Sequence, residues 1–459
     1  MHRRAILALA AAAICATAAA AERPPNIVMI LADDLGLNPV GAYGNPYAAT
    51  PVIDRLAREG LIFTAAYAAS PVCSPSRAAI MTGKSPARMQ LTDFIPGHPF
   101  PYARLLQPKW RKSLNEKILP HFLTDRGYAT GLFGKWHVPN RYRPPQTTHE
   151  RAKPHGFQEA FLTEKPPENS DPEDDAHSVA AITERALDFI DRHQHEPFFA
   201  LLAPNAIHSP VMAPAALVAK HRRRPGADAP ENNPIIAAMM EQLDAALGEV
   251  LAKLDTLNLS GNTLVIFASD NGGNSNDASQ APFRGGKAQL YEGGLRIPVI
   301  MRWPGTIAAG TTSDVLISSP DFFPTLLEVA GTSIPADEPR DGVSLLPIMR
   351  GQTARSERPL VWHYPHYHTA GVHGPASAIR HRDWKLIHYY EHALADHGAA
   401  DELFNLRADP SESRNLIAEE PTRAAELLAA LQQYLSAAGA QVPTVNADFD
   451  AARATYLNR

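Results

Sequence analysis

The sequence predicts an α/β fold, with a large, mixed but mostly parallel sheet flanked by helices and a smaller C-terminal α+β subdomain containing a short antiparallel sheet. Two observations predict it. Continuous apolar runs of strand length alternate along the chain with amphipathic stretches, the pattern of a sheet covered by helices. Past residue 350 the pattern changes to short strands separated by turns. The 459 residues suffice for one large domain with an appendage.

The predicted strands of the large sheet are apolar throughout, as expected for strands buried on both faces. They cover residues 27–32, 198–202 and 264–268. The predicted helices carry apolar residues at helical spacing and cover residues 53–59, 178–192 and 235–254. Because chemistry in a doubly wound sheet sits at the carboxyl ends of the strands, polar residues that follow these runs are candidate site residues.

The C-terminal part is predicted to contain strands at residues 377–380, 384–390 and 401–406 and a helix at 421–436 with leucines along one side. Residues 141–175 are rich in proline, histidine and charge without a clear period, which predicts surface loops. Residues 448–459 are predicted to form a loosely held tail. We therefore expect a signal peptide at 1–21, a catalytic domain at 22–350 and a C-terminal subdomain at 351–459.

Residues 1–21 have a basic start, an alanine-rich apolar stretch and small residues before the expected cleavage point, which indicates a secretory signal. A membrane anchor is the alternative, but the stretch is short for a span; the pair Arg3-Arg4 would also suit twin-arginine export. We expect a periplasmic or secreted protein without membrane attachment after cleavage. Cleavage removes both arginines and no acidic residue, so the net charge moves from −5 to −7, which does not favour nucleic acid as a partner.

The chain has two cysteines, Cys15 and Cys73. Cys15 lies in the segment expected to be removed, so the mature protein would hold a single thiol and no intramolecular disulfide. A lone cysteine is ordinarily a small buried hydrophobic residue. Because Cys73 would have no disulfide partner, a role other than a structural crosslink is expected for its thiol.

Two pairs of residues with oxygen-bearing side chains follow predicted strands. Asp33 and Asp34 come after the first run, and Asp270 and Asn271 after the run at 264–268. A turn or a helix cap explains either pair alone, but two adjacent carboxylates repel unless a cation lies between them. Hard oxygen ligands at two ends of one sheet favour Ca²⁺ or Mg²⁺ over zinc.

Cationic and imidazole side chains recur in short loops: Lys135 and His137 in GKWH, His208 in NAIHSP, and Lys287 in RGGK ahead of EGG. Each stretch alone could be an ordinary surface loop. Together they offer donors for the oxygens of a tetrahedral anion and groups able to transfer protons.

The run CSPSRAAIMTGK from Cys73 to Lys84 resembles the signature of type I sulfatases, formylglycine-dependent enzymes of the alkaline-phosphatase-like superfamily. In that family a maturation enzyme oxidises the cysteine to formylglycine, and the hydrated aldehyde is the nucleophile. The resemblance covers nearly the whole mature chain. It implies an alkaline-phosphatase-like form of the predicted fold and hydrolysis of sulfate monoesters, with bacterial enzymes acting on sulfated carbohydrates as the nearest group.

The same resemblance implies a role for each candidate. A divalent cation, calcium rather than magnesium, would be held by the residue at position 73 together with Asp33, Asp34, Asp270 and Asn271. Arg77 would steady the modified residue, Lys135 and Lys287 would bind sulfate oxygens, His208 would protonate the departing alcohol, and His137 would take the proton from the second hydroxyl. The family's usual Pro-His-x pattern ahead of His208 is replaced here by Asn205-Ala206-Ile207, which puts the neighbouring pocket in question.

The substrate is expected to be a small-molecule or oligosaccharide sulfate ester. The stretch 362–368 contains three histidines with aromatic neighbours; a second metal site is one interpretation, but a sugar-facing loop is favoured, with His366 and Arg380 as substrate-binding residues. The alternatives are an arylsulfatase of broad specificity, a phosphonate or phosphate monoester hydrolase of the same superfamily, and an inactive carbohydrate-binding protein.

Overall fold

The computed structural model describes residues 23–138, 156–333, 339–352, 357–370, 374–395 and 399–454. The predicted signal peptide at 1–21 lies outside the described residues. So do residues 139–155 of the predicted loop region and residues 455–459 of the predicted tail.

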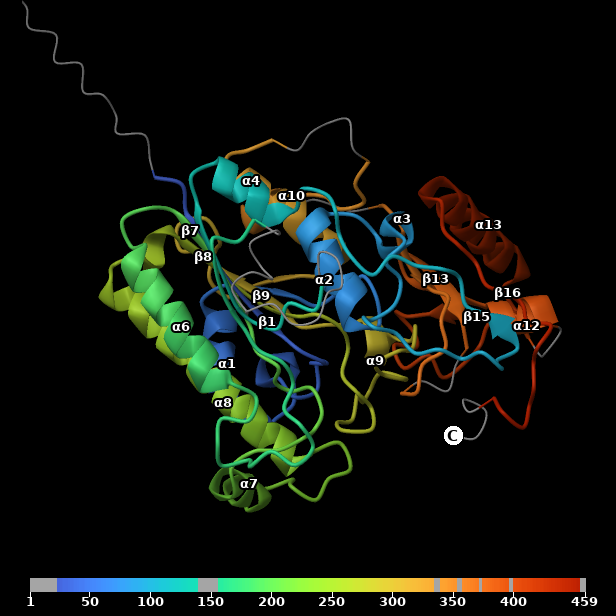
Figure 1. The fold of residues 1–459 in the computed structure, drawn as a ribbon, viewed down its shortest axis with the longest axis horizontal. Coiled ribbons are helices and arrows are strands. Elements are labelled where there is room, and N and C mark those ends of the chain that lie inside the picture. The colour runs from blue at the N-terminus through green and yellow to red at the C-terminus, as the bar shows by residue number, and fades with distance from the viewer. Residues whose placement is uncertain are drawn as a thin grey trace, which may run out of the picture.

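A mixed, mostly parallel eight-stranded sheet forms the centre of the larger part of the molecule (Figure 1). In spatial order its strands are β10 (Thr311–Ser313), β2 (Leu61–Phe63), β9 (Val299–Arg302), β8 (Thr263–Ser269), β1 (Asn26–Ala32), β7 (Phe198–Ala203), β5 (Ala129–Gly134) and β6 (Glu159–Leu162). Strand β9 runs antiparallel to both of its neighbours, and the other pairs are parallel. The predicted fold class is confirmed.

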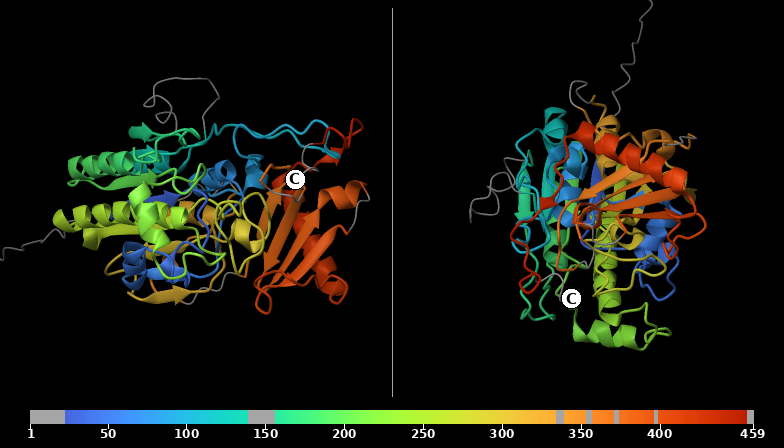
Figure 2. Two further views of the ribbon diagram at one scale, coloured as in Figure 1. Left: turned by 90° about the horizontal axis from the view of Figure 1, so that it is seen from below. Right: turned by 90° about the vertical axis from the view of Figure 1, so that its right-hand side faces the viewer.

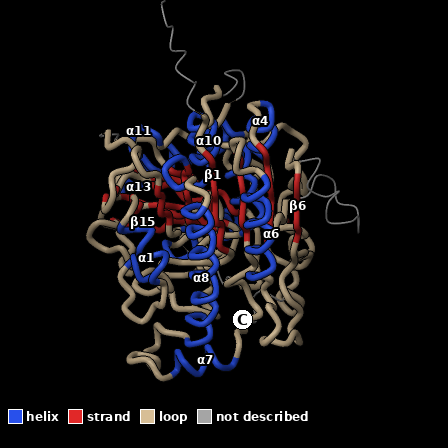
Figure 3. Tube along the Cα trace, turned by 90° about the vertical axis from the view of Figure 1, so that its left-hand side faces the viewer, coloured by secondary structure: helices blue, strands red, loops and turns tan. Residues whose placement is uncertain are grey.

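Both faces of this sheet are covered by helices. Alternate residues of β1 point to opposite sides, so that Ile27, Met29 and Leu31 join one core and Val28 and Ile30 join the other. The first core also contains residues of α2 (Cys73–Thr82), α4 (Leu119–Asp125) and α10 (Phe322–Val329). The second contains residues of α1 (Pro51–Arg58), α6 (Val179–Arg192) and α8 (Pro234–Thr256), and Figure 3 shows α6 and α8 lying across that face.

The C-terminal part is an antiparallel sheet with one helix against it, as predicted. Its strands, in order, are β12 (Leu360–Tyr364), β13 (Ala376–His381), β14 (Trp384–Tyr389) and β15 (Asp401–Asn405). Leucines of α13 (Pro421–Ala438) pack on this sheet, which lies at the end of the molecule away from α6 and α8 (Figure 2). The boundary at residue 350 stays a prediction.

Shorter elements complete the described chain. They are α3 (Pro86–Met89), α7 (Ala215–Arg222), α9 (Glu292–Leu295), α11 (Leu346–Met349), α12 (Tyr390–Ala395), β3 (Ala66–Tyr67), β4 (Leu105–Leu106), β11 (Ile317–Ser318) and β16 (Thr444–Val445), with 3₁₀ turns at Gly41–Tyr43, Ser260–Asn262 and Ser319–Asp321. None of the helices in the described ranges has the length and apolar character needed to cross a bilayer.

Two sequence predictions are wrong. The region predicted as loops contains the edge strand β6, whose four residues are all half-buried and therefore show no alternation. Residues 448–454 are held rather than loose, because the Arg104 guanidinium lies 4.5 Å from the centre of the Phe449 ring and Ala454 is buried.

Candidate active site

Four neighbouring strands of the sheet end in site residues. Strands β8, β1, β7 and β5 are adjacent and parallel, so their carboxyl ends lie side by side. Asp270 follows β8, Asp33 and Asp34 follow β1, His208 lies beyond β7, and Lys135 follows β5. The order of the strands therefore brings together residues that are up to 237 positions apart.

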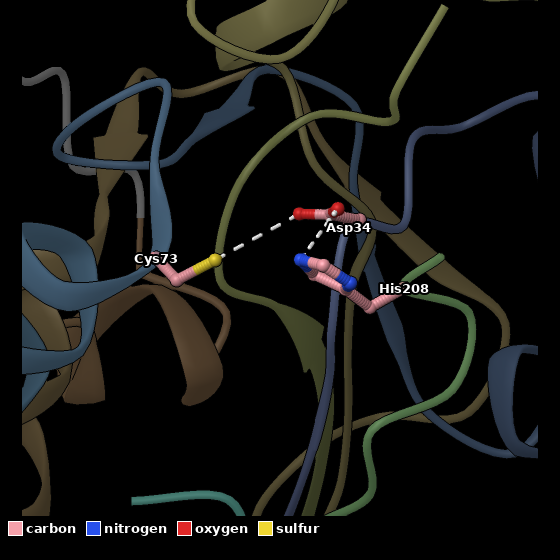
Figure 4. Close-up of side chains that lie close together, drawn as sticks. All are labelled: Asp34, Cys73 and His208. Atoms are coloured by element: carbon pink, nitrogen blue, oxygen red, sulfur yellow. Dashed lines mark hydrogen bonds and ion pairs between the residues drawn. The ribbon is translucent and has the colours of Figure 1, made fainter. Parts of the chain in front are cut away.

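The centre of the site is a buried acidic cluster. Ligand atoms of Asp33, Asp34, Asp270 and Cys73 all lie within 4.8 Å of one another, and none of the four residues is more than 2% exposed. The Cys73 thiol faces the two neighbouring carboxylates, with Sγ 3.5 Å from Asp33 Oδ1 and 3.8 Å from Asp34 Oδ1. In Figure 4 dashed lines connect the Asp34 carboxylate to the Cys73 sulfur and to a ring nitrogen of His208.

Each carboxylate has a cationic partner. Lys135 Nζ donates to both oxygens of Asp33, at 2.9 and 2.7 Å. Arg77 Nε donates to Asp270 Oδ2 at 2.7 Å. The third pair is Lys287 with Asp34. Three carboxylates are thus paired with three cationic side chains.

Asp34 is the carboxylate next to both Lys287 and His208. Lys287 Nζ donates to Asp34 Oδ2 at 2.7 Å and lies 3.0 Å from His208 Nε2. His208 Nδ1 lies 2.6 Å from the Ser209 carbonyl and can only donate there, so Nε2 is the acceptor that Lys287 meets. Lys287 Nζ is therefore held between the Asp34 carboxylate and the His208 ring.

Helix α2 carries Cys73 as its first residue and Arg77 one turn later, which places both side chains on one face. Pro75 falls in the first turn, where its missing N–H would have had no partner inside the helix. The helix ends at Gly83, whose φ of 70° is the left-handed conformation that glycine adopts without strain. The CSPSR run therefore forms a buried helix start beside the acidic cluster.

The surroundings shift the pKa values in different directions. Burial alone would raise the pKa of Asp33, but Lys135, His208, Arg77 and Lys287 outweigh it and hold the pKa well below its usual range. Burial, together with Asp270, raises the pKa of the Cys73 thiol. The unmodified thiol is therefore protonated and a poor nucleophile.

His137 is held as a neutral base. Its Nε2 lies 2.6 Å from the Ile95 carbonyl and must donate to it, which leaves the lone pair on Nδ1. Burial and the positive charge of Lys135 lower the pKa of His137 well below its ordinary value. Nδ1 is buried and finds no hydrogen-bond partner among the described residues, so it is available to accept a proton.

The departure at Asn205-Ala206-Ile207 leaves His208 in place. The backbone of this segment pairs with Asp33, through Asp33 N–H to the Ala206 carbonyl at 3.0 Å and Ile207 N–H to the Asp33 carbonyl at 2.9 Å. Asn205 is buried and donates to Thr163 Oγ1 at 2.7 Å. The segment therefore supports the acidic cluster through its main chain.

The donor set fits a hard cation. Asn271 donates from Nδ2 to Asp34 Oδ1 at 2.8 Å, while its own Oδ1 is buried with no hydrogen-bond partner in the described part of the chain. An unpaired amide oxygen beside three carboxylate groups is the type of ligand that Ca²⁺ and Mg²⁺ take. The residues that could hold such an ion are Asp33, Asp34, Asp270 and Asn271, with the side chain at position 73.

Neither predicted substrate-binding residue lies among these groups. His366 is fully buried and uses both ring nitrogens, toward Thr92 Oγ1 at 2.8 Å and Gln107 Oε1 at 3.0 Å. Arg380 donates to the Tyr67 hydroxyl and to the Arg382 carbonyl. Both side chains thus take part in contacts within the protein, and a role in substrate binding stays a prediction.

The sequence analysis missed the segment that carries Ile95. The Ile95 N–H donates to Ser74 Oγ at 3.0 Å, and its carbonyl fixes His137. The segment has no charge pattern or motif that would have identified it. Of the three histidines in 362–368, it is His368 whose pKa is affected by Lys287 and Asp34, and the sequence around the three could not distinguish them.

Comparisons with known proteins decide the family. The family model described as Sulfatase matches residues 25–332, and that described as N-sulphoglucosamine sulphohydrolase, C-terminal, matches residues 286–441. The chain belongs to the sulfatase family. It is therefore a sulfuric ester hydrolase, and its family supports hydrolysis of sulfate esters.

Curated relatives of this sulfatase include the N-acetylgalactosamine-6-sulfatase of Sus scrofa, 34% identical over 78% of this chain and 72% of the relative. Arylsulfatase A of Homo sapiens is 32% identical over 90% of this chain and 87% of the relative. These identities over most of both chains agree with the family assignment.

Solved structures share the fold. The structure of Ps i-CgsB in complex with k-i-k-neocarrahexaose has a TM-score of 0.76 and 24% identity over 95% of this chain and 97% of that chain. A phosphonate monoester hydrolase of Agrobacterium radiobacter has a TM-score of 0.69 and 19% identity over 90% and 96%. At these identities the likeness shows the fold alone, so the fold does not separate sulfate from phosphonate chemistry.

Proposed function

We propose that this sulfatase removes sulfate from a sulfated saccharide, using a formylglycine made from Cys73 and a bound Ca²⁺. The observation that carries the proposal is the buried cluster in which the Cys73 side chain meets three carboxylates within 4.8 Å. A thiol held protonated in that position is a poor nucleophile, whereas a hydrated aldehyde there would offer a hydroxyl beside a cation. The maturation enzyme that makes formylglycine is a required partner.

The charge balance of the site suits an anionic substrate once a cation is bound. The three carboxylates and the three cationic side chains of the cluster cancel, so a bound divalent ion would leave the site with an excess of two positive charges. When bound, the ion would withdraw electron density from the sulfate and favour ionisation of the hydroxyl at position 73. Calcium is preferred to magnesium because several protein oxygens converge and Mg²⁺ usually keeps more water.

The side chains of the chain then have separate tasks. Lys135 and Lys287 are proposed to bind the sulfate oxygens, since their ammonium groups lie on the two carboxylates that face Cys73. Arg77 orients Asp270 and the start of α2 through its bond to that carboxylate. These groups bind and hold the sulfate; they do not transfer protons.

Two histidines are proposed to move protons. His208 would act as the acid in its doubly protonated form, in which Lys287 has moved to a sulfate oxygen and Nε2 carries the proton that passes to the departing alcohol. His137 would accept a proton at Nδ1, which its bond to Ile95 leaves free of hydrogen. The two rings approach the cluster from different strands, which allows one to act as acid and the other as base.

A saccharide is favoured as substrate because a curated relative is named N-acetylgalactosamine-6-sulfatase and a structural neighbour was solved in complex with k-i-k-neocarrahexaose. Arylsulfatase A among the relatives keeps an aryl sulfate as the alternative. We retain the proposals of a signal peptide at 1–21, a catalytic domain at 22–350, a C-terminal subdomain at 351–459 and a periplasmic or secreted location.

The test is expression with and without a formylglycine-generating enzyme, followed by mass spectrometry of the peptide that contains position 73. Hydrolysis of 4-nitrophenyl sulfate, 4-nitrophenyl phosphate and N-acetylgalactosamine 6-sulfate is measured on the same samples. We expect the aldehyde and sulfate release to appear together and to be absent from the Cys73→Ala variant. Full activity with only free thiol at position 73, or faster hydrolysis of the phosphate, would refute the proposal.

A further inference from the structure

A loop next to the catalytic residues presents aromatic side chains. Residue Ile95 is fixed on both sides, with its N–H on Ser74 of α2 and its carbonyl on His137. The preceding residue, Phe94, is only partly buried and packs against the hydrophobic cluster that contains Ala288, the neighbour of Lys287. Phe94 therefore directly precedes a residue that contacts both α2 and His137.

The imidazole rings of His98 and His368 both pack against Phe94. The centre of the Phe94 ring is 4.9 Å from that of His98 and 5.1 Å from that of His368, and the two imidazole centres are 5.7 Å apart. The three rings meet at interplanar angles of 65° to 68°. Edge-to-face contacts of this kind stabilise a fixed arrangement, so the three rings form a cluster before any ligand binds.

The protonation of His368 follows from its main-chain contact. The Ala370 N–H donates to His368 Nδ1 at 2.9 Å, so in the neutral ring the proton must be on Nε2. Burial, followed by the positive charge of Lys287 and the His98 ring, lowers the pKa of His368 to about 3. At neutral pH this ring is uncharged and offers one N–H donor.

That donor has no protein acceptor. Among the described residues no hydrogen bond from His368 Nε2 is formed, although the residue is only 8% exposed. The ring packs on Phe94 at 5.1 Å, next to the Ile95 segment that contacts Ser74 and His137, and the charges of Lys287 and Asp34 also act on its pKa. A nearly buried, uncharged donor suits an uncharged acceptor, such as a sugar hydroxyl or an N-acetyl carbonyl, better than a carboxylate.

We propose that Phe94, His98 and His368 form the subsite for the sugar ring that carries the sulfate, with His368 Nε2–H donating to an uncharged oxygen of that sugar and Phe94 packing against its face. The inference rests on the proposed function and deepens it. It replaces His366 by His368 as the specificity-determining histidine, because His366 has no ring nitrogen left for a ligand.

The test compares substrates rather than absolute rates. Enzyme with formylglycine at position 73 is assayed on 4-nitrophenyl sulfate and on N-acetylgalactosamine 6-sulfate, N-acetylglucosamine 6-sulfate and galactose 6-sulfate. His368→Phe keeps a ring but removes the donor, so we expect the ratio of kcat/KM for the best saccharide to kcat/KM for the aryl ester to fall about tenfold. His368→Gln, which returns an N–H at similar reach, should recover part of the ratio.

Two further variants complete the design. Phe94→Ala should lower kcat/KM for saccharide and aryl ester alike by about fivefold, since either ring can pack on it. The matched control is His195→Ala, an exposed histidine ahead of β7 at the opposite end of the strand from the site, which should leave both substrates and their ratio unchanged.

An unchanged ratio in His368→Phe would overturn the inference. So would wild-type enzyme that hydrolyses 4-nitrophenyl sulfate but none of the three saccharides. Wild-type enzyme that carries the aldehyde and hydrolyses none of the four esters would instead refute the proposed function, and the inference would fall with it.

Discussion

Replacing Lys135 by methionine tests the charge balance of the active site. Lys135 Nζ lies 2.9 and 2.7 Å from the two oxygens of Asp33, and the two side chains are 12% and 0% exposed. Removing one partner of a buried pair leaves an uncompensated charge and costs about 3–5 kcal/mol. In a chelating buffer, Lys135→Met should therefore lower the free energy of unfolding by that amount.

Calcium should restore much of this loss, because the ion supplies positive charge to the same carboxylate. If half of it is restored, about 2 kcal/mol, linkage requires that the variant bind Ca²⁺ roughly thirtyfold more tightly than the wild type. Activity should fall all the same, by about 10²–10³ in kcat, because a donor to the sulfate oxygens is missing.

Urea unfolding with chelator and with excess Ca²⁺, together with calorimetric titration of Ca²⁺, measures both effects. The control is Lys117→Met, which breaks an ion pair with Asp125 whose side chains are both 64% exposed; it should change stability by at most about 1 kcal/mol, with or without calcium. Equal destabilisation of Lys135→Met in both buffers, or weaker Ca²⁺ binding by the variant, would refute the reasoning.

Three further predictions concern the ion, a buried network and pH. Asn271→Ala should weaken Ca²⁺ binding about tenfold in calorimetry while leaving unfolding in chelator within about 1 kcal/mol of wild type; unchanged affinity would exclude the amide oxygen as a ligand. Lys385→Met, which leaves Glu292 and Glu412 buried without their shared cation at 3.1 and 2.8 Å, should cost about 3–5 kcal/mol of unfolding free energy whether or not calcium is present, and a calcium-dependent loss would contradict this. Burial lowers the pKa of His366 to about 3. Between about pH 6.5 and 3 the unfolded state therefore binds a proton at this histidine and the folded state does not, so the free energy of unfolding falls as the pH drops. His366→Gln should reduce that slope by up to about 1.4 kcal/mol per pH unit in urea titrations, and an unchanged slope would show that the folded protein accepts the proton.

The sequence by itself determined the sheet and the composition of the site. Strands that are apolar throughout bury both of their faces only when helices cover both sides of the sheet. For this reason β1, β7 and β8 were predicted within one residue of each of their bounds. The polar groups after those runs had to meet at one edge, because parallel strands end on the same side. The CSPSR run added Cys73, and local spacing was enough for each of these steps.

The tertiary structure decided which side chains touch. Only strand order pairs Lys135 with Asp33 and Lys287 with Asp34, since those contacts join segments that no local pattern relates. The same holds for the histidines of 362–368. The packing around β12 places both ring nitrogens of His366 in hydrogen bonds, whereas only Nδ1 of His368 has a hydrogen-bond partner among the described residues. Side-chain direction at the end of a strand depends on neighbours far away in the chain, and the sequence carries no local record of them.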